Sequence, residues 1–124
     1  MFKFPKNDAK YFWTQHVLRK MVYYGLTPDR VKRLIRNPKR VEDGIASNTI
    51  AVMSAPPGRD LAFGRQPKNK KPKGEVWAMY QTKPKSKQKI VISAWRYPGV
   101  SPIGKQIPIP KDILEELKNE GIID

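Results

Sequence analysis

A helix end and a helix start lie two residues apart near the N-terminus, and this spacing constrains the fold more than any other feature. Residues 14–24 carry apolar side chains at helical spacing, and Gly25 follows as a residue that readily ends a helix. Thr27-Pro28 then supplies a hydroxyl N-cap and a proline at the first helical position, where its missing N–H costs nothing. The spacing therefore predicts a tight hairpin of two short helices.

Both predicted helices have an apolar and a polar face. In the second, Val31, Leu34 and Ile35 form the buried face, and Asn37-Pro38 ends the helix. In the first, the polar side chains fall in a stripe opposite the apolar face, which we expect to face solvent or a ligand. This stripe consists of His16, Arg19, Lys20 and Tyr23.

The rest of the chain contains β-like segments. Residues 75–81 and 89–95 are rich in β-branched and aromatic side chains, residues 49–53 form a third such segment, and Arg40-Val41 can begin a fourth. A short basic loop between 81 and 89 favours antiparallel pairing of the segments that it joins. The prediction is an α+β fold, with two N-terminal helices followed by an antiparallel sheet of three to four strands and a short C-terminal helix.

The charge is large and unevenly distributed. The chain holds 25 Lys and Arg against 11 Asp and Glu, a formal net charge of +14. Residues 1–110 contain 23 basic and 6 acidic side chains, whereas residues 111–124 contain 2 and 5. We therefore expect one basic domain over 1–110, with a mobile basic loop at 54–74 that is rich in proline and glycine, and an acidic C-terminal helix or tail at 111–124.

Several classes of protein are disfavoured. The absence of cysteine excludes disulfides, thiolate nucleophiles and cysteine-ligated zinc. The acidic residues are too scattered to predict a two-metal site, and phosphate-binding glycine motifs are missing, so we expect neither a metal nor a cofactor. No stretch approaches about 18 consecutive apolar residues, and the N-terminus lacks an apolar signal core, so we expect a cytoplasmic protein with no membrane partner.

Short motifs occur along the chain: His16-Val17-Leu18-Arg19-Lys20-Met21, Gly25-Leu26, Val31, Ile35, Asn37-Pro38 and Ile92-Ser93-Ala94-Trp95-Arg96. With these motifs, over roughly residues 11–97, the sequence resembles the BrnT-like proteins of the wider RelE-like toxin group. The group folds as two helices followed by an antiparallel sheet. The resemblance implies an RNA-directed protein, in many members an endoribonuclease that a partner antitoxin neutralises. The segment 54–74 and the acidic C-terminal end depart from that compact pattern.

Four residues are candidates for catalysis. His16 and Arg19 match the helix motif of the resemblance, and Arg96 matches the arginine that closes its last strand. RNA cleavage without a metal needs a base, an acid and cations around the phosphorane, for which His16 is the only imidazole. Arg96 can clamp a phosphate, and Tyr97 can stack on a base or move a proton. The alternatives are an exposed or capping His16, and an Arg96-Tyr97 pair that only completes the sheet and packs on the proline-rich segment behind it.

A larger set of cations predicts nucleic-acid binding. Most of it follows one helix face and the helix exit, which concentrates charge on one side, although a solvated helix face is the alternative. The loop lysines would add salt-dependent affinity without reading sequence. Aromatic residues can stack on bases or pack in the core. The predicted binding residues are Lys20, Lys32, Arg33, Arg36, Lys39, Arg40, Lys70, Lys71, Lys85 and Lys87.

Two functions from different classes fit these features. The first is an RNA-binding protein of RelE/BrnT-like type, either with metal-independent endoribonuclease activity or without it. The second is a non-catalytic module that binds RNA or DNA, for example on the ribosome. The expected partners are RNA and, in the first case, an antitoxin protein. A cleft that gathers His16, Arg96 and Tyr80 or Tyr97 around one phosphate would favour the enzyme.

Overall fold

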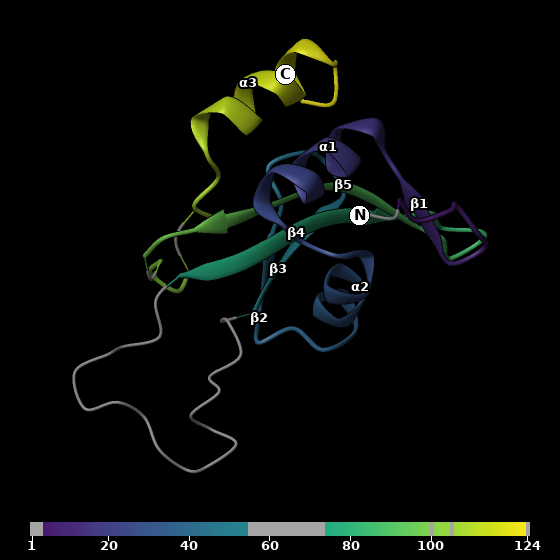
Figure 1. Cartoon of the computed structure of the whole chain (residues 1–124), viewed down its shortest axis with the longest axis horizontal. Coiled ribbons are helices and arrows are strands. Elements are labelled where there is room, and N and C mark those ends of the chain that lie inside the picture. Colours follow the sequence, from purple (N-terminus) through teal and green to yellow (C-terminus); the bar gives the residue numbers. More distant parts are fainter. Residues whose placement is uncertain (1–3, 55–73, 100, 105, 124) are drawn as a thin grey trace.

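The computed structural model describes residues 4–54, 74–99, 101–104 and 106–123, and in this part of the chain it has three helices and five strands (Figure 1). The fold is α+β, as predicted. Residues 55–73 lie outside the described residues, and with them most of the predicted loop at 54–74, including Lys70 and Lys71. The elements in chain order are β1 (Tyr11–Trp13), α1 (Gln15–Tyr24), α2 (Pro28–Arg36), β2 (Arg40–Asp43), β3 (Thr49–Ser54), β4 (Glu75–Thr82), β5 (Lys89–Tyr97) and α3 (Lys111–Asn119).

The helical hairpin forms through the capping residues that the sequence supplies. The Thr14 side chain accepts a hydrogen bond from the Val17 N–H at the start of α1, and Gly25 ends that helix with a left-handed φ of 67°. The Thr27 side chain accepts from the Arg30 N–H at the start of α2, which has proline in its first turn. The prediction of two adjacent short helices is confirmed.

The sheet differs from the prediction. Its strand order is β1-β5-β4-β3-β2, with four strands in antiparallel succession and β1 parallel to β5. The prediction of a purely antiparallel sheet of three to four strands that follows the helices is therefore wrong in three respects. The sheet has five strands, β1 precedes α1, and the parallel pairing of β1 with β5 makes the sheet mixed. β1 has only three residues, too few for an alternating pattern, and its partner on β5 lies far away in the sequence.

Both faces of the sheet are covered. One face packs Val76, Ala78 and Ala94 against the apolar sides of α1 and α2. The other face packs Trp77, Met79 and Trp95 against α3. The C-terminal helix was predicted from its apolar positions, and Ile113 and Leu117 are indeed fully buried. α3 is thus part of the core. None of the described helices is long and apolar enough to cross a membrane.

The edge of β5 positions the site described next. β1 pairs only with residues 89–91 of β5, so residues 92–97 have no strand beside them on that edge within the described chain. α1 lies along β5, and α3 meets α1 there, as Figure 1 shows. Polar groups from three elements that are distant in sequence are brought together at this edge.

Candidate functional site

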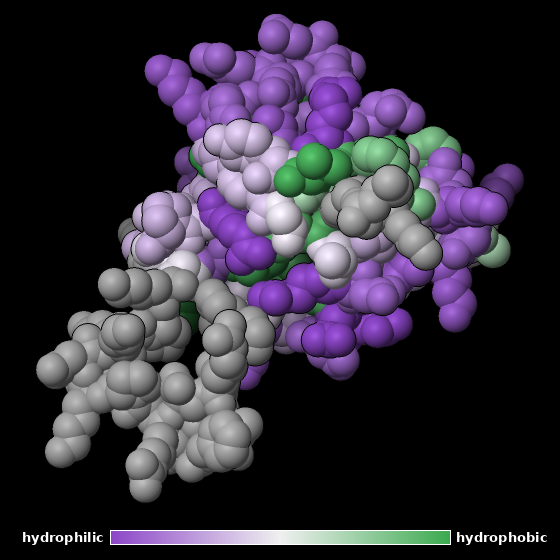
Figure 2. Space-filling view, in the orientation of Figure 1, coloured by the Kyte–Doolittle hydropathy of each residue, from purple (hydrophilic) through white to green (hydrophobic). Residues whose placement is uncertain are grey.

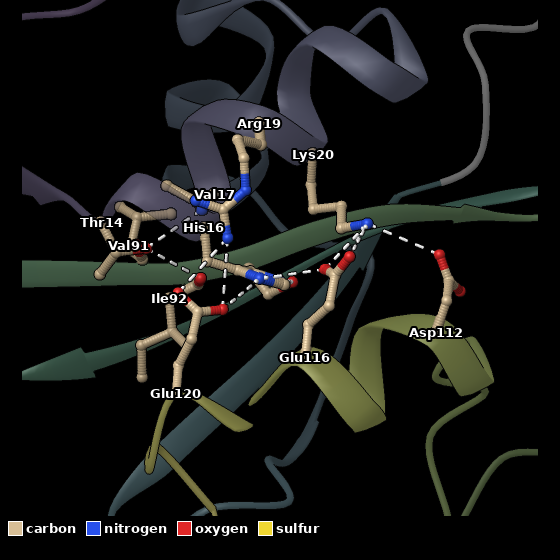
Figure 3. Close-up of polar contacts among 11 residues, drawn as sticks. Thr14, His16, Val17, Arg19, Lys20, Val91, Ile92, Asp112, Glu116 and Glu120 are labelled. Atoms are coloured by element: carbon tan, nitrogen blue, oxygen red, sulfur yellow. Dashed lines mark hydrogen bonds and ion pairs between the residues drawn. The ribbon is translucent and has the colours of Figure 1, made fainter. Parts of the chain in front are cut away.

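The single histidine lies in a polar cluster enclosed by α1, β5 and α3. His16 and Ser93 are both fully buried, and His16 Nε2 lies 2.9 Å from Ser93 Oγ. The other ring nitrogen, Nδ1, lies 3.4 Å from Oε2 of Glu116 on α3 and 3.3 Å from Oε2 of Glu120, the C-cap residue of that helix (Figure 3). The imidazole therefore joins a strand hydroxyl to the carboxylates of the C-terminal helix.

The carboxylates of α3 form a matching stripe for the cations of α1. Asp112, Glu116 and Glu120 are spaced by four residues and therefore share one helix face. Lys20 Nζ lies 2.9 Å from Glu116 and 3.5 Å from Asp112, and Arg19 Nη2 lies 3.3 Å from Glu120 (Figure 3). These contacts neutralise the polar stripe of α1 within the molecule.

Burial governs the protonation of His16. Desolvation lowers the pKa of the imidazole below its ordinary value; Glu120 and Glu116 oppose this effect, and Lys20 and Arg19 add to it. Nδ1 is buried, and although two carboxylates are near, it makes no well-aligned hydrogen bond among the described residues. His16 is therefore neutral at pH 7, with one ring nitrogen available to accept a proton.

The order Ser93, His16 and carboxylate is that of a hydroxyl, a base and a group that orients the base. Such a set can activate a hydroxyl only where substrate can reach it. Ser93 and His16 have no exposed surface, and α3 supplies the carboxylates that cover them. In this arrangement the cluster links α3 to the sheet through polar contacts.

The expected exposure of the α1 stripe is corrected for two of its members. His16 is fully buried and Lys20 is 7% exposed, whereas Arg19 and Tyr23 are exposed. The predicted nucleic-acid contact at Lys20 is therefore occupied by carboxylates of α3. The signal that could have found this arrangement was the acidic side chains of 111–124 repeating every four residues opposite the cations of 16–20.

Arg40 was predicted to contact nucleic acid and lies instead in a second buried network. Its guanidinium donates to Glu42 Oε2 at 2.7 Å, to Ser101 Oγ at 2.8 Å and to Pro102 O at 2.8 Å, and it stacks over the Trp77 ring at 5.1 Å. Its side chain is only 8% exposed. Arg40 therefore holds the segment at 101–102 against the sheet and has little surface left for a ligand.

Other predicted binding residues do lie on the surface. Arg33, Arg36 and Lys39 are exposed on α2 and at its exit, and Lys32 is half-buried with its ammonium 5.5 Å from the Tyr11 ring centre. Figure 2 shows a largely hydrophilic surface over α2. α2 and its exit thus carry the first group of predicted binding residues that are exposed.

The hairpin between β4 and β5 carries the second exposed group of cations. Lys83, Lys85 and Lys87 are exposed, and Lys87 adopts a positive φ of 62° in the turn. The hairpin is antiparallel, as predicted. Its position at a tip leaves these lysines free to approach a large polyanion.

Arg96 and Tyr97 occupy opposite faces of the sheet. Arg96 is paired in register with Val76, on the face covered by α1 and α2, and its Nε donates to Tyr24 O at 2.8 Å. Tyr97 is paired with Glu75 and packs with the cluster beneath α3. Since His16 is sealed beneath α3 while Arg96 is exposed on the other face, these predicted catalytic residues do not share one site.

The aromatic side chains mostly belong to the core. Trp13, Trp77 and Trp95 are 0–2% exposed, and the rings of Trp77 and Trp95 stack with centroids 6.2 Å apart. Among the described residues Phe12 and Tyr23 are the aromatic rings outside 1–10 that remain well exposed, at 41% and 72%. Base stacking by the described residues can therefore involve few aromatic rings.

A pocket of about 380 Å³ lies between the end of β2 and residues 106–107. Glu42 and Asp43 line it together with Gly44 and Gln106, so its charge does not suit an anion. The described residues contain no group of three or more histidine or acidic side chains arranged to hold a metal ion. Neither feature identifies a small-molecule or metal site.

Fold and surface together define a small α+β protein with a sealed histidine cluster and an exposed basic face. Comparison with models of known protein families, with curated proteins and with solved structures finds no match to this chain. The resemblance to the BrnT-like proteins accordingly stays a prediction from short motifs.

Proposed function

We propose that this protein binds RNA through the exposed cations of α2, supported by the lysines of the β4–β5 hairpin. The observation that carries the proposal is a division among the cations. Lys20, Arg19 and Arg40 are paired with carboxylates, whereas Arg33 and Arg36 on α2 form no ion pair within the described part of the chain. A cation that has no internal partner remains available to a phosphate.

The arrangement of the exposed cations favours a long polyanion over a small one. α2 lies on the sheet face, and Lys85 and Lys87 lie at the tip of the hairpin, so these groups are spread over the surface and are not gathered in a cleft. Phosphates spaced along an RNA backbone match dispersed cations, and each neutralised phosphate releases counterions. The net charge of +14 adds a long-range electrostatic attraction between the protein and RNA.

Binding without catalysis is the form that the geometry supports. His16 cannot touch a scissile phosphate while α3 covers it, and Arg96 lies on the other face of the sheet. An endoribonuclease of the RelE/BrnT-like type would need α3 to leave this position. Because α3 also fills the core through Ile113 and Leu117, we propose the non-catalytic role first. The predicted antitoxin partner belongs to the endoribonuclease alternative.

Two double variants with the same charge change test the surface. Arg33→Glu with Arg36→Glu should weaken binding to a single-stranded RNA more than Lys85→Glu with Lys87→Glu, because the arginines lie on the larger basic face and can form bidentate contacts with phosphates. Fluorescence anisotropy at about 50 mM salt measures both affinities.

Equal losses from the two double variants would mean that α2 is not the primary surface. Absence of binding by the wild-type chain at this low salt would contradict the RNA proposal itself. Helical and sheet content by circular dichroism confirms that each variant is folded, and both pairs lie at solvent-accessible positions where substitution should not disturb the core.

A further inference from the structure

Arg30, at the first turn of α2, has a buried donor without a partner. Its Nη2 atom is inaccessible to solvent and makes no hydrogen bond with the described residues. Buried polar atoms are nearly always paired, and an exception calls for a water, an ion or a functional explanation. The sequence pattern did not single out Arg30, because it lies at the side of α2 between the apolar face and the exposed cations.

Two further arginines lie near enough to Arg30 for their charges to act on it. Arg33 lies three residues along the same helix, and therefore about one turn from Arg30. Arg96 extends from β5 on the sheet face that α2 covers, and its bond from Nε to Tyr24 O fixes the guanidinium beside the α1–α2 connection. The charges of Arg96 and Arg33 both act on Arg30.

The three guanidinium groups lack internal neutralisation. None of them forms an ion pair with a carboxylate in the described parts of the chain, although Asp29 is adjacent to Arg30 in sequence. Burial, followed by Arg96 and Arg33, lowers the pKa of Arg30, so the protein opposes the charge that Arg30 carries. An anion near the three groups would reverse this repulsion. The Arg30 side chain as a whole is only half-buried, so a ligand can reach it from the surface, and a rotation of its guanidinium would let the unpaired N–H donate to that ligand.

We propose that Arg30, Arg33 and Arg96 form a binding site for a phosphate group. Guanidinium forks donate in pairs to phosphate oxygens, and Arg96 is already oriented by its bond to a backbone carbonyl. The inference deepens the RNA-binding proposal, on which its biological meaning rests, by naming where one backbone phosphate is held. The same chemistry fits a free phosphate or a mononucleotide.

A titration of the wild-type chain tests the site without any substitution. Inorganic phosphate, followed by a nucleoside monophosphate and a short single-stranded RNA, is added while the arginine Nε–Hε signals are followed by NMR. Saturable shifts at Arg30 and Arg96, with small shifts at Arg19, which is paired with Glu120, support the site. Absence of saturable shifts at Arg30 and Arg96 with all three ligands overturns it.

Conservative variants give an independent measurement. Arg30→Lys and Arg96→Lys keep the charge but lose the fork, so each should weaken RNA binding about tenfold. Arg19→Lys, at an arginine that is paired with Glu120 and lies outside the proposed surface, should change RNA binding less than about twofold. Equal effects of Arg30→Lys and Arg19→Lys would overturn the site. The amide spectrum of each variant reports whether α2 is still folded.

The outcomes separate this inference from the RNA proposal. RNA binding that is insensitive to Arg30→Lys and Arg96→Lys, with no phosphate shifts, overturns the site and leaves the RNA proposal standing. Saturable shifts with phosphate or mononucleotide but no RNA binding support the site and contradict the RNA proposal. Tighter binding of RNA than of either small ligand identifies the backbone as the source of the phosphate.

Discussion

His16 shows how the surroundings of one residue change what its chemistry can do. As the only imidazole of the chain it is the natural candidate for proton transfer. In the folded protein it is instead the connection between Ser93 on β5 and the carboxylates of α3. Its position favours a neutral ring, and this gives a measurable consequence for stability.

We predict that acidification from pH 7.5 to 5.5 lowers the free energy of unfolding through His16. Because burial lowers the pKa of folded His16 below 6.5, the unfolded chain binds the proton more tightly than the folded chain. The contribution of neutral His16 to the free energy of unfolding is therefore complete above the pKa of the unfolded chain and is lost as the pH falls below it. The loss amounts to about 1.4 kcal/mol for each unit by which folding lowers the pKa of His16.

Urea denaturation of the wild type and of His16→Gln across this range measures the effect. The groups that face the ring are Glu116, Glu120, Lys20 and Arg19, and the variant keeps all of them. The free energy of unfolding of the variant should depend less on pH than that of the wild type. If the wild type instead becomes more stable on acidification, the carboxylates outweigh burial and His16 is protonated in the fold.

α3 is the element for which charge alone would mislead. Its acidic side chains indicate a competitor that covers the basic surface, and the carboxylates do pair with Lys20 and Arg19. Ile113 and Leu117 are nevertheless fully buried against the tryptophans of the sheet. α3 is therefore a structural part of the domain, in addition to any electrostatic effect on ligands.

We predict that Leu117→Ala lowers the free energy of unfolding by about 2–5 kcal/mol, because it leaves a cavity in the core. Glu115→Ala, at an exposed position of the same helix, should change stability by less than about 0.5 kcal/mol. Chemical denaturation measures both. Truncation after Pro110 should be more damaging still, because His16 and Lys20 would also lose their partners. A Leu117→Ala variant as stable as the wild type would mean that α3 is not docked in solution.

At the scale of the whole molecule, the cations fall into two populations. The cations of the first population form internal ion pairs, at the α1–α3 contact and around Arg40. The other lies on α2 and on the β4–β5 hairpin and gives the described surface its excess of positive charge. A polyanion should therefore respond to the second population and to the ionic strength of the medium.

We predict that the affinity for single-stranded RNA falls about 50-fold between about 50 and 200 mM salt if about four phosphates are contacted, since each contributes about −0.7 to the logarithmic slope. Anisotropy titrations at several salt concentrations give the slope directly. Arg33→Glu with Arg36→Glu should reduce its magnitude, because fewer counterions are released. A slope near zero for the wild type would rule out phosphate contacts as the source of binding.

Local signals determined the helical part of this protein. Thr14, Gly25 and Thr27-Pro28 act on the backbone within a few residues, so α1 and α2 could be predicted from sequence, as could the apolar side of α3. The hairpin from β4 to β5 is similarly local. The sequence by itself also determined the net charge and, through the amphipathic spacing of α2, the exposed position of Arg33 and Arg36.

Only the tertiary structure decided the non-local arrangement. The pairing of β1 with β5 depends on a contact over most of the chain, which no pattern within three residues can encode. The burial of His16 and the ion pairs of Lys20 depend on where α3 returns to the sheet. The hydrogen bonds of Arg40 to Ser101 depend in the same way on the return of residue 101. Whether a charged side chain meets solvent or a carboxylate is set by its neighbours in space, and sequence spacing fixes neighbours only within one element.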